Sequence, residues 1–201
     1  KDWEKPIRVR RANGGFLSEK GINIDMTPVK SGERYFYVWS HRKNIGTPLD
    51  TGSMLMIAEF DPVHPEQLIS EPKCLYGFEN TEHTINNEGP YAFYYNNKIY
   101  LAYSGGDARG YLYAIGMLTA NDGDDLCDLS VWEKAKTPIA SFATIPGEYG
   151  PGHNSFFWDR DQNLWIAYHA VTSFEEKIVS SGMRRVYFEQ DKTPRFDVIV
   201  E

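Results

Sequence analysis

The chain has 201 residues, enough for one sizeable domain with a hydrophobic core of its own. Its 28 acidic and 21 basic residues give a net charge of −7, so we expect no nucleic acid as a partner, because phosphate backbones are also negative. There is no run of about eighteen apolar residues to predict a membrane span, and two cysteines without CxxC spacing exclude a disulfide framework and a thiolate zinc site.

Three β-hairpins are predicted along the chain. Aromatic residues make up 14% of the sequence, and such side chains favour a pleated, half-buried surface. Each hairpin joins a short apolar strand to an alternating aromatic strand through a turn that contains Gly, Asn or Asp. The paired strands are expected at 24–29 with 34–40, at 87–93 with 98–104, and at 152–157 with 163–169.

A third and a fourth strand are predicted after each hairpin. The third strands are expected at 53–60, 111–119 and 183–189, and the fourth at 68–75, 132–139 and 196–200. The residues from Trp3 to Ile7 repeat the Trp-Glu-Lys and Pro-Ile pairs that begin at Trp132. Residues 1–11 are therefore predicted to form the outer strand of a preceding unit.

Four strands per unit, repeated about every 64 residues, are typical of β-propeller blades. We therefore expect an all-β fold with three blades at about 21–75, 86–140 and 151–201, as part of a five-bladed propeller. A β-sandwich with recurring strands is the alternative. Because a propeller needs at least four blades, the missing amino-terminal blades are expected outside this chain, with a separate partner chain as one possible source.

Three ionisable residues recur at one point of the three hairpins. Asp25, Glu88 and His153 lie 63 and 65 residues apart, each on the first strand of its unit. First strands line the axis of a propeller, so these side chains are expected to converge on one funnel. Two carboxylates across a sugar-sized gap are what glycoside hydrolysis requires. Ordinary strand-entry residues are the alternative explanation.

The motifs around these residues resemble those of family 43 glycoside hydrolases. Asn87-Glu88-Gly89-Pro90, with the aromatic hairpin that follows, is similar to the blade that carries the general acid in that family. The segment Ile24-Asp25-Met26-Thr27 is similar to the second carboxylate motif, and 150–156 is similar to a later blade with an axial histidine. The resemblance covers residues 3–196.

The resemblance implies a role for each site residue. Glu88 is the expected general acid, and Asp25 is expected to orient it and favour its protonated form. His153 is the expected ligand of an axial metal ion, often calcium in that family, although the chemistry itself requires no cofactor. Asn87, Tyr91 and Trp39 are expected to bind substrate, with core packing as the alternative for the two aromatic residues.

The resemblance also implies a general base, an aspartate on the first blade in an Asp-Pro pair. The Asp-Pro pair of this sequence, Asp61-Pro62, follows a third strand, so the base is expected outside this chain. The expected function is inverting hydrolysis of α-L-arabinofuranosides or β-D-xylosides in plant cell-wall polysaccharide, with an isolated chain that is inactive. A carbohydrate-binding propeller without catalysis, or a degenerate paralogue, is the alternative.

Overall fold

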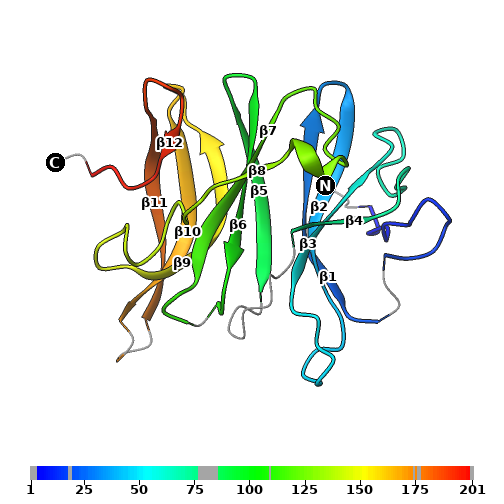
Figure 1. The fold of residues 1–201 in the computed structure, drawn as a ribbon, viewed down its shortest axis with the longest axis horizontal. Coiled ribbons are helices and arrows are strands. Elements are labelled where there is room, and N and C mark those ends of the chain that lie inside the picture. Colours follow the sequence, from blue (N-terminus) through cyan, green and yellow to red (C-terminus); the bar gives the residue numbers. More distant parts are fainter. Residues whose placement is uncertain are drawn as a thin grey trace.

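The computed structural model describes residues 4–17, 20–76, 86–108, 110–173, 175 and 178–199. Within these residues, twelve strands form three four-stranded antiparallel sheets that stand side by side (Figure 1). The first sheet consists, in spatial order, of β1 (Ile22–Ser31), β2 (Arg34–Arg42), β3 (Met54–Glu59) and β4 (Lys73–Tyr76).

The second and third sheets repeat this meander. The second contains β5 (Asn87–Tyr95), β6 (Lys98–Gly105), β7 (Ala114–Asn121) and β8 (Glu133–Lys134), with the 3-10 turn η1 (Leu129–Val131) before β8. The third contains β9 (Tyr149–Trp158), β10 (Leu164–Ser173), β11 (Ile178–Phe188) and β12 (Pro194–Arg195). The described residues contain no helix that is long and apolar enough to cross a membrane.

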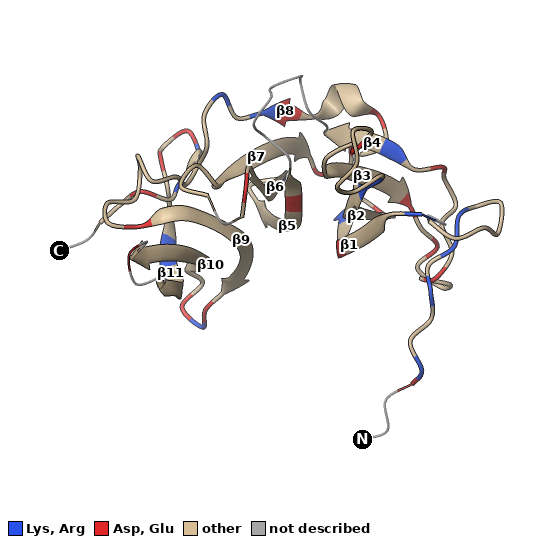
Figure 2. Ribbon diagram, turned by 90° about the horizontal axis from the view of Figure 1, so that it is seen from below, with Lys and Arg blue, Asp and Glu red and all other residues tan. Residues whose placement is uncertain are grey.

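The sheets are arranged as consecutive blades. Seen end-on, they form an arc with β1, β5 and β9 on its inner side and β4 and β8 on its outer side (Figure 2). Local turn chemistry closes each inner hairpin. Asn96 and Asn97 both adopt left-handed backbone angles between β5 and β6, a conformation that Asn tolerates better than most residues.

The hydrophobic core lies between neighbouring sheets. Strand β6 is buried on both faces, so its alternating side chains contribute to two clusters. Ile99 and Leu101 pack with Val38 of the first sheet, whereas Tyr100 packs with Phe156 of the third. The second sheet therefore holds the other two together and fixes the positions of their inner strands.

The predicted all-β architecture of three four-stranded blades is confirmed, with corrections at two edges. The fourth strand of the last sheet lies at Pro194–Arg195 instead of 196–200, where it pairs with Tyr187 and Phe188. For the expected outer strand at 1–11, residues 1–3 lie outside the described residues and residues 4–9 form no strand. An outer strand forms by pairing with the third strand of its own sheet, and residues 4–9 pair with no described strand. Arg10 instead forms a parallel bridge with Gln67.

Candidate active site

Each inner strand carries a β-bulge at the same point. In each blade, the inner strand advances by three residues over a stretch in which its partner advances by two, so the inner strand contains one extra residue. The paired residues on the two sides of the bulge are Ile24–Ser40 and Thr27–Val38, Glu88–Ser104 and Tyr91–Ala102, and Gly152–His169 and Ser155–Ala167. Bulges aim side chains out of the regular pleat and are common next to active sites.

The first residue of every bulge has a left-handed backbone. The φ angles are 56° at Asp25, 58° at Gly89 and 52° at His153. Only glycine adopts this conformation without strain, and such strain in other residues is concentrated at functional sites. Because the same conformation recurs at Asp25 and His153, the fold holds both side chains in a direction that a regular strand would not give them.

The bulges correct the predicted equivalence of Asp25, Glu88 and His153. The residue of the second blade that matches Asp25 and His153 is Gly89, and Glu88 precedes it by one position. Successive side chains on a strand point to opposite faces, so a one-residue offset changes what a side chain faces. Glu88 therefore lies just before the bulge, where it still pairs with Ser104 of the neighbouring strand.

The three bulge residues contact one another across the sheets. The Gly89 amide donates a hydrogen bond to Asp25 Oδ2 at 3.1 Å, and His153 Nε2 lies 3.9 Å from Asp25 Oδ1. A methyl group on Gly89 would lie 3.4 Å from His153 Nδ1, so glycine lets the imidazole approach closely. Asp25 and His153 are thus brought together as predicted, through the backbone that carries Glu88.

The inner strands also line a cavity of about 550 Å³. Its lining includes Asp25, Tyr91, His153 and Asn154. The side-chain amide of Asn154 is buried, and neither its nitrogen nor its oxygen has a hydrogen-bond partner. An unpaired buried amide is costly, so Asn154 is an unsatisfied polar group directly beneath the cavity wall.

Glu88 is partly buried at the end of β5, where a tyrosine holds it. The Tyr113 hydroxyl donates a hydrogen bond to Glu88 Oε1 at 2.8 Å. Burial raises the pKa of Tyr113, and the nearby Glu88 charge contributes to the increase, so the phenol stays protonated. Burial also lowers the pKa of His169, reinforced by the charge of His153 and opposed by Glu88.

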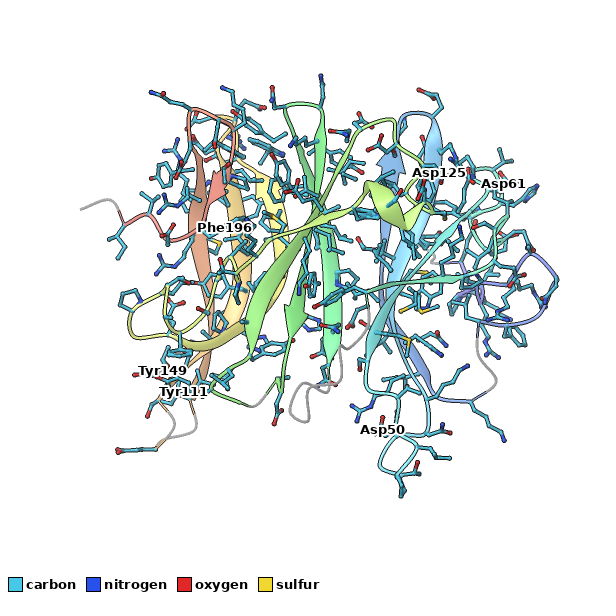
Figure 3. The ribbon with its side chains drawn as sticks, in the orientation of Figure 1. Asp50, Asp61, Tyr111, Asp125, Tyr149 and Phe196 are labelled. Carbon is cyan, nitrogen blue, oxygen red and sulfur yellow. The ribbon has the colours of Figure 1, made fainter. Side chains whose placement is uncertain are left out.

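Arg42 adds a positive charge near Glu88. Its guanidinium pairs with Asp50 at 2.6 Å and donates to Asn86 Oδ1 at 3.0 Å. The hydrogen bond to Asp50 raises the pKa of Arg42, and the Glu88 charge adds to this effect. Asp50 lies at the same end of the sheets as Tyr111 and Tyr149 of the second and third blades (Figure 3).

The predicted substrate-binding residues occupy different environments. Tyr91 is 38% exposed and lines the cavity. Asn87 is buried, and its backbone amide donates to the Ser53 carbonyl. Trp39 is 1% exposed and its indole N–H is bonded to Asn23, so its ring belongs to the core, which was the alternative explanation.

The described residues do not by themselves complete the predicted calcium site at His153. Calcium takes six to eight oxygen ligands. Among the described residues, no group of three or more His, Cys, Asp or Glu side chains is placed to hold a metal ion. Asp25 and His153 supply one carboxylate and one imidazole, so the axial calcium ion stays a prediction.

Sequence reasoning missed three neighbours of Glu88: Tyr113, Arg42 and His169. Arg42 and His169 are ionisable residues in the second strands, after a run of mostly aromatic and aliphatic side chains, and that change is a usable signal. Tyr113 immediately precedes β7, and the other two repeats have no tyrosine at the corresponding position. The local sequence therefore gave no signal that Tyr113 contacts Glu88.

Comparison with known proteins identifies the family of this chain. The family model described as "Glycosyl hydrolases family 43" matches residues 1–194 of the chain. The chain belongs to glycosyl hydrolase family 43. Family 43 relatives include an extracellular exo-α-(1→5)-L-arabinofuranosidase of Streptomyces chartreusis, which is 31% identical over 84% of this chain and 49% of its own length.

Other family 43 proteins share the fold. An α-L-arabinofuranosidase of Humicola insolens is 29% identical over 91% of this chain and 41% of its own length. The crystal structure of an α-L-arabinofuranosidase from Lactobacillus brevis superposes with a TM-score of 0.73, at 27% identity, over 87% of this chain and 55% of that one. The chain thus spans about half the length of these relatives.

Proposed function

We propose that this chain supplies the general acid of an inverting glycosidase that acts on α-L-arabinofuranosides, and that Glu88 is that acid. The observation that carries the proposal is the position of the Glu88 carboxyl near the beginning of the inner strand β5. Its carboxyl accepts a hydrogen bond from Tyr113, and the next residue, Gly89, is bonded to Asp25. A partly buried carboxyl beside a second carboxylate is the arrangement that keeps an acid protonated for catalysis.

In the proposed reaction, Glu88 gives its proton to the glycosidic oxygen as the bond to the anomeric carbon breaks. A base carboxylate takes a proton from water, whose oxygen attacks the anomeric carbon from the opposite face. The configuration at that carbon is inverted. We assign the base to the part of the relatives' length that this chain does not cover.

Asp25 has a positioning role in this proposal. Its carboxylate accepts the hydrogen bond of the Gly89 amide, and Gly89 is the residue that follows Glu88. The peptide that carries Glu88 is therefore fixed in place by the Asp25 carboxylate. The arabinofuranoside preference rests on the names of the relatives, and β-D-xylosides are the second substrate class to assay.

The test uses a longer protein in which this chain is joined to the part of its relatives' length that it does not cover, hereafter the completed enzyme. The variant Glu88→Gln should abolish hydrolysis of arabino-oligosaccharides, whose leaving groups need a proton, and should spare an activated aryl arabinofuranoside far more. Glu148→Gln is the matched control, because Glu148 is also a partly buried carboxylate that accepts a hydrogen bond from a tyrosine, Tyr168.

Full oligosaccharide turnover by Glu88→Gln would refute the assignment of the acid. Activity of the isolated chain equal to that of the completed enzyme would refute the external base. Sugar binding by a completed enzyme without any turnover would instead support the non-catalytic alternative.

A further inference from the structure

A buried tyrosine directly contacts the proposed acid and has no assigned role. Tyr113 is fully buried at the end of the loop between β6 and β7, and its hydroxyl donates to Glu88 Oε1 at 2.8 Å. Ser104 Oγ accepts the His153 amide at 2.6 Å, and Ser104 is the residue that pairs with Glu88 across β5 and β6. Ser104 therefore links the His153 bulge to the strand pair that carries Glu88.

The fold gives the Tyr113 ring a single position. A methyl group on Gly152 would lie 2.0 Å from the ring, so β9 accepts the tyrosine only because that residue is glycine. A methyl group on Gly150 would similarly lie 2.5 Å from the Gly110 carbonyl oxygen. On another side, the ring stacks on His169, with centroids 5.9 Å apart. Gly152 and His169 thus border the ring on two sides and limit where the hydroxyl can point.

We propose that Tyr113 is a positioning residue for general-acid catalysis: it occupies Glu88 Oε1, so that the transferable proton is carried by Oε2. The inference rests on the proposed role of Glu88. Because burial raises the pKa of Tyr113, its hydroxyl remains a donor throughout the working pH range. Oε1 then accepts a hydrogen bond before and after proton transfer, and Oε2 is left to face the glycosidic oxygen.

The same bond changes the strength of the acid. A donor to a carboxylate stabilises the charged form more than the protonated form. Removing the Tyr113 hydroxyl should therefore move the alkaline limb of the completed enzyme's rate profile to higher pH. The other charged or titratable groups that the described residues place around Glu88 and Tyr113 include Asp25 on β1, Arg42 on β2 and His169 on β10. Replacing Tyr113 leaves these groups unchanged.

A first experiment tests the contact in this chain without any activity. With tyrosine labelled at the carbon that bears the hydroxyl, the Tyr113 NMR signal should shift as the pH rises from about 3 to about 8, the range in which carboxyl groups ionise. The shift should disappear in Glu88→Gln and persist in Glu148→Gln. A pH-independent Tyr113 signal in the parent chain, or one that responds equally in Glu88→Gln, would overturn the inference.

A second experiment measures the consequence in the completed enzyme. Tyr113→Phe should reduce kcat on arabino-oligosaccharides about tenfold, as expected for a lost hydrogen bond to a charged group, and should move the alkaline limb of the rate profile to higher pH. Tyr168→Phe is the matched control: it also removes a buried hydroxyl that donates to a carboxylate, and it should leave that limb unchanged.

The outcomes separate the two proposals. An alkaline limb that is the same in Tyr113→Phe and the parent, while Glu88→Gln is inactive, would overturn the positioning role alone. Full oligosaccharide turnover by Glu88→Gln would instead remove the proposed acid itself.

Discussion

The Gly89 amide donates a hydrogen bond to the Asp25 carboxylate, N to Oδ2 3.1 Å, across the boundary between the first two blades. Both residues have left-handed backbones at the equivalent bulge of their strands. One carboxylate thus joins two blades and fixes the peptide next to Glu88. The geometry of the proposed acid consequently depends on the packing of the sheets as much as on its own strand.

Replacing Gly89 tests the backbone part of this relationship. Gly89→Ala should lower the free energy of unfolding by about 1–2 kcal/mol, because an L-residue is strained at this φ angle. Gly147→Ala is the matched control, since Gly147 also has a positive φ but has nothing within 4 Å of an added methyl group. Urea denaturation should give similar losses for the two variants, whereas only Gly89→Ala should lower turnover by the completed enzyme. Equal turnover in both variants would contradict this.

The variant Asp25→Asn tests the effect of the negative charge of the Asp25 carboxylate on activity. The asparagine oxygen can still accept the Gly89 hydrogen bond, so the free energy of unfolding should change by less than about 1 kcal/mol, as for a partly exposed ion pair. Removing a negative charge favours the ionised form of a neighbouring acid. The alkaline limb of the rate profile should therefore move to lower pH, opposite to the effect of Tyr113→Phe. A shift in the same direction for both variants would contradict the electrostatic argument.

The buried His41 and the partly buried His169 should make stability depend on pH. Burial lowers the pKa values of His41 and His169, so the folded chain binds fewer protons than the unfolded chain just below about pH 6.5. Their contribution is complete above about pH 6.5 and is lost as the pH falls through the folded pKa values. Urea midpoints should therefore decrease from about pH 7.5 to about pH 5, and less so in a His41→Gln/His169→Gln double variant. An unchanged slope in that variant would be inconsistent with this origin.

Leu101→Ala tests whether the sheets unfold as one unit. Leu101 is fully buried between the first and second sheets, so the loss should be about 2–5 kcal/mol. Leu112→Ala, at a position that is 71% exposed, should stay within about 0.5 kcal/mol of the parent. A single transition, detected alike by tryptophan fluorescence and circular dichroism, would show cooperative unfolding. Separate transitions in the parent chain would show that the sheets unfold independently.

Features encoded within a single hairpin could be predicted from the sequence. Turn residues such as Asn96 and Asn97, and the alternation along β6, act over a few residues, so the strand pairs and their repeat were correctly expected. The Asn-Glu-Gly-Pro motif likewise located Glu88 on an inner strand. A short outer strand such as β12 forms only two pairs with its neighbour, so its sequence pattern is weak and its predicted position was shifted by two residues.

The tertiary structure decided what surrounds Glu88. A bulge inserts one residue, and that single step makes Gly89 rather than Glu88 the counterpart of Asp25 and His153. Tyr113 reaches Glu88 only because glycine at position 152 leaves room for its ring in the next blade. Contacts of this kind depend on how neighbouring blades pack against each other, which no local pattern encodes. The sequence by itself therefore determined the hairpins and the motif of the acid, whereas the packing of three blades determined the environment in which that acid works.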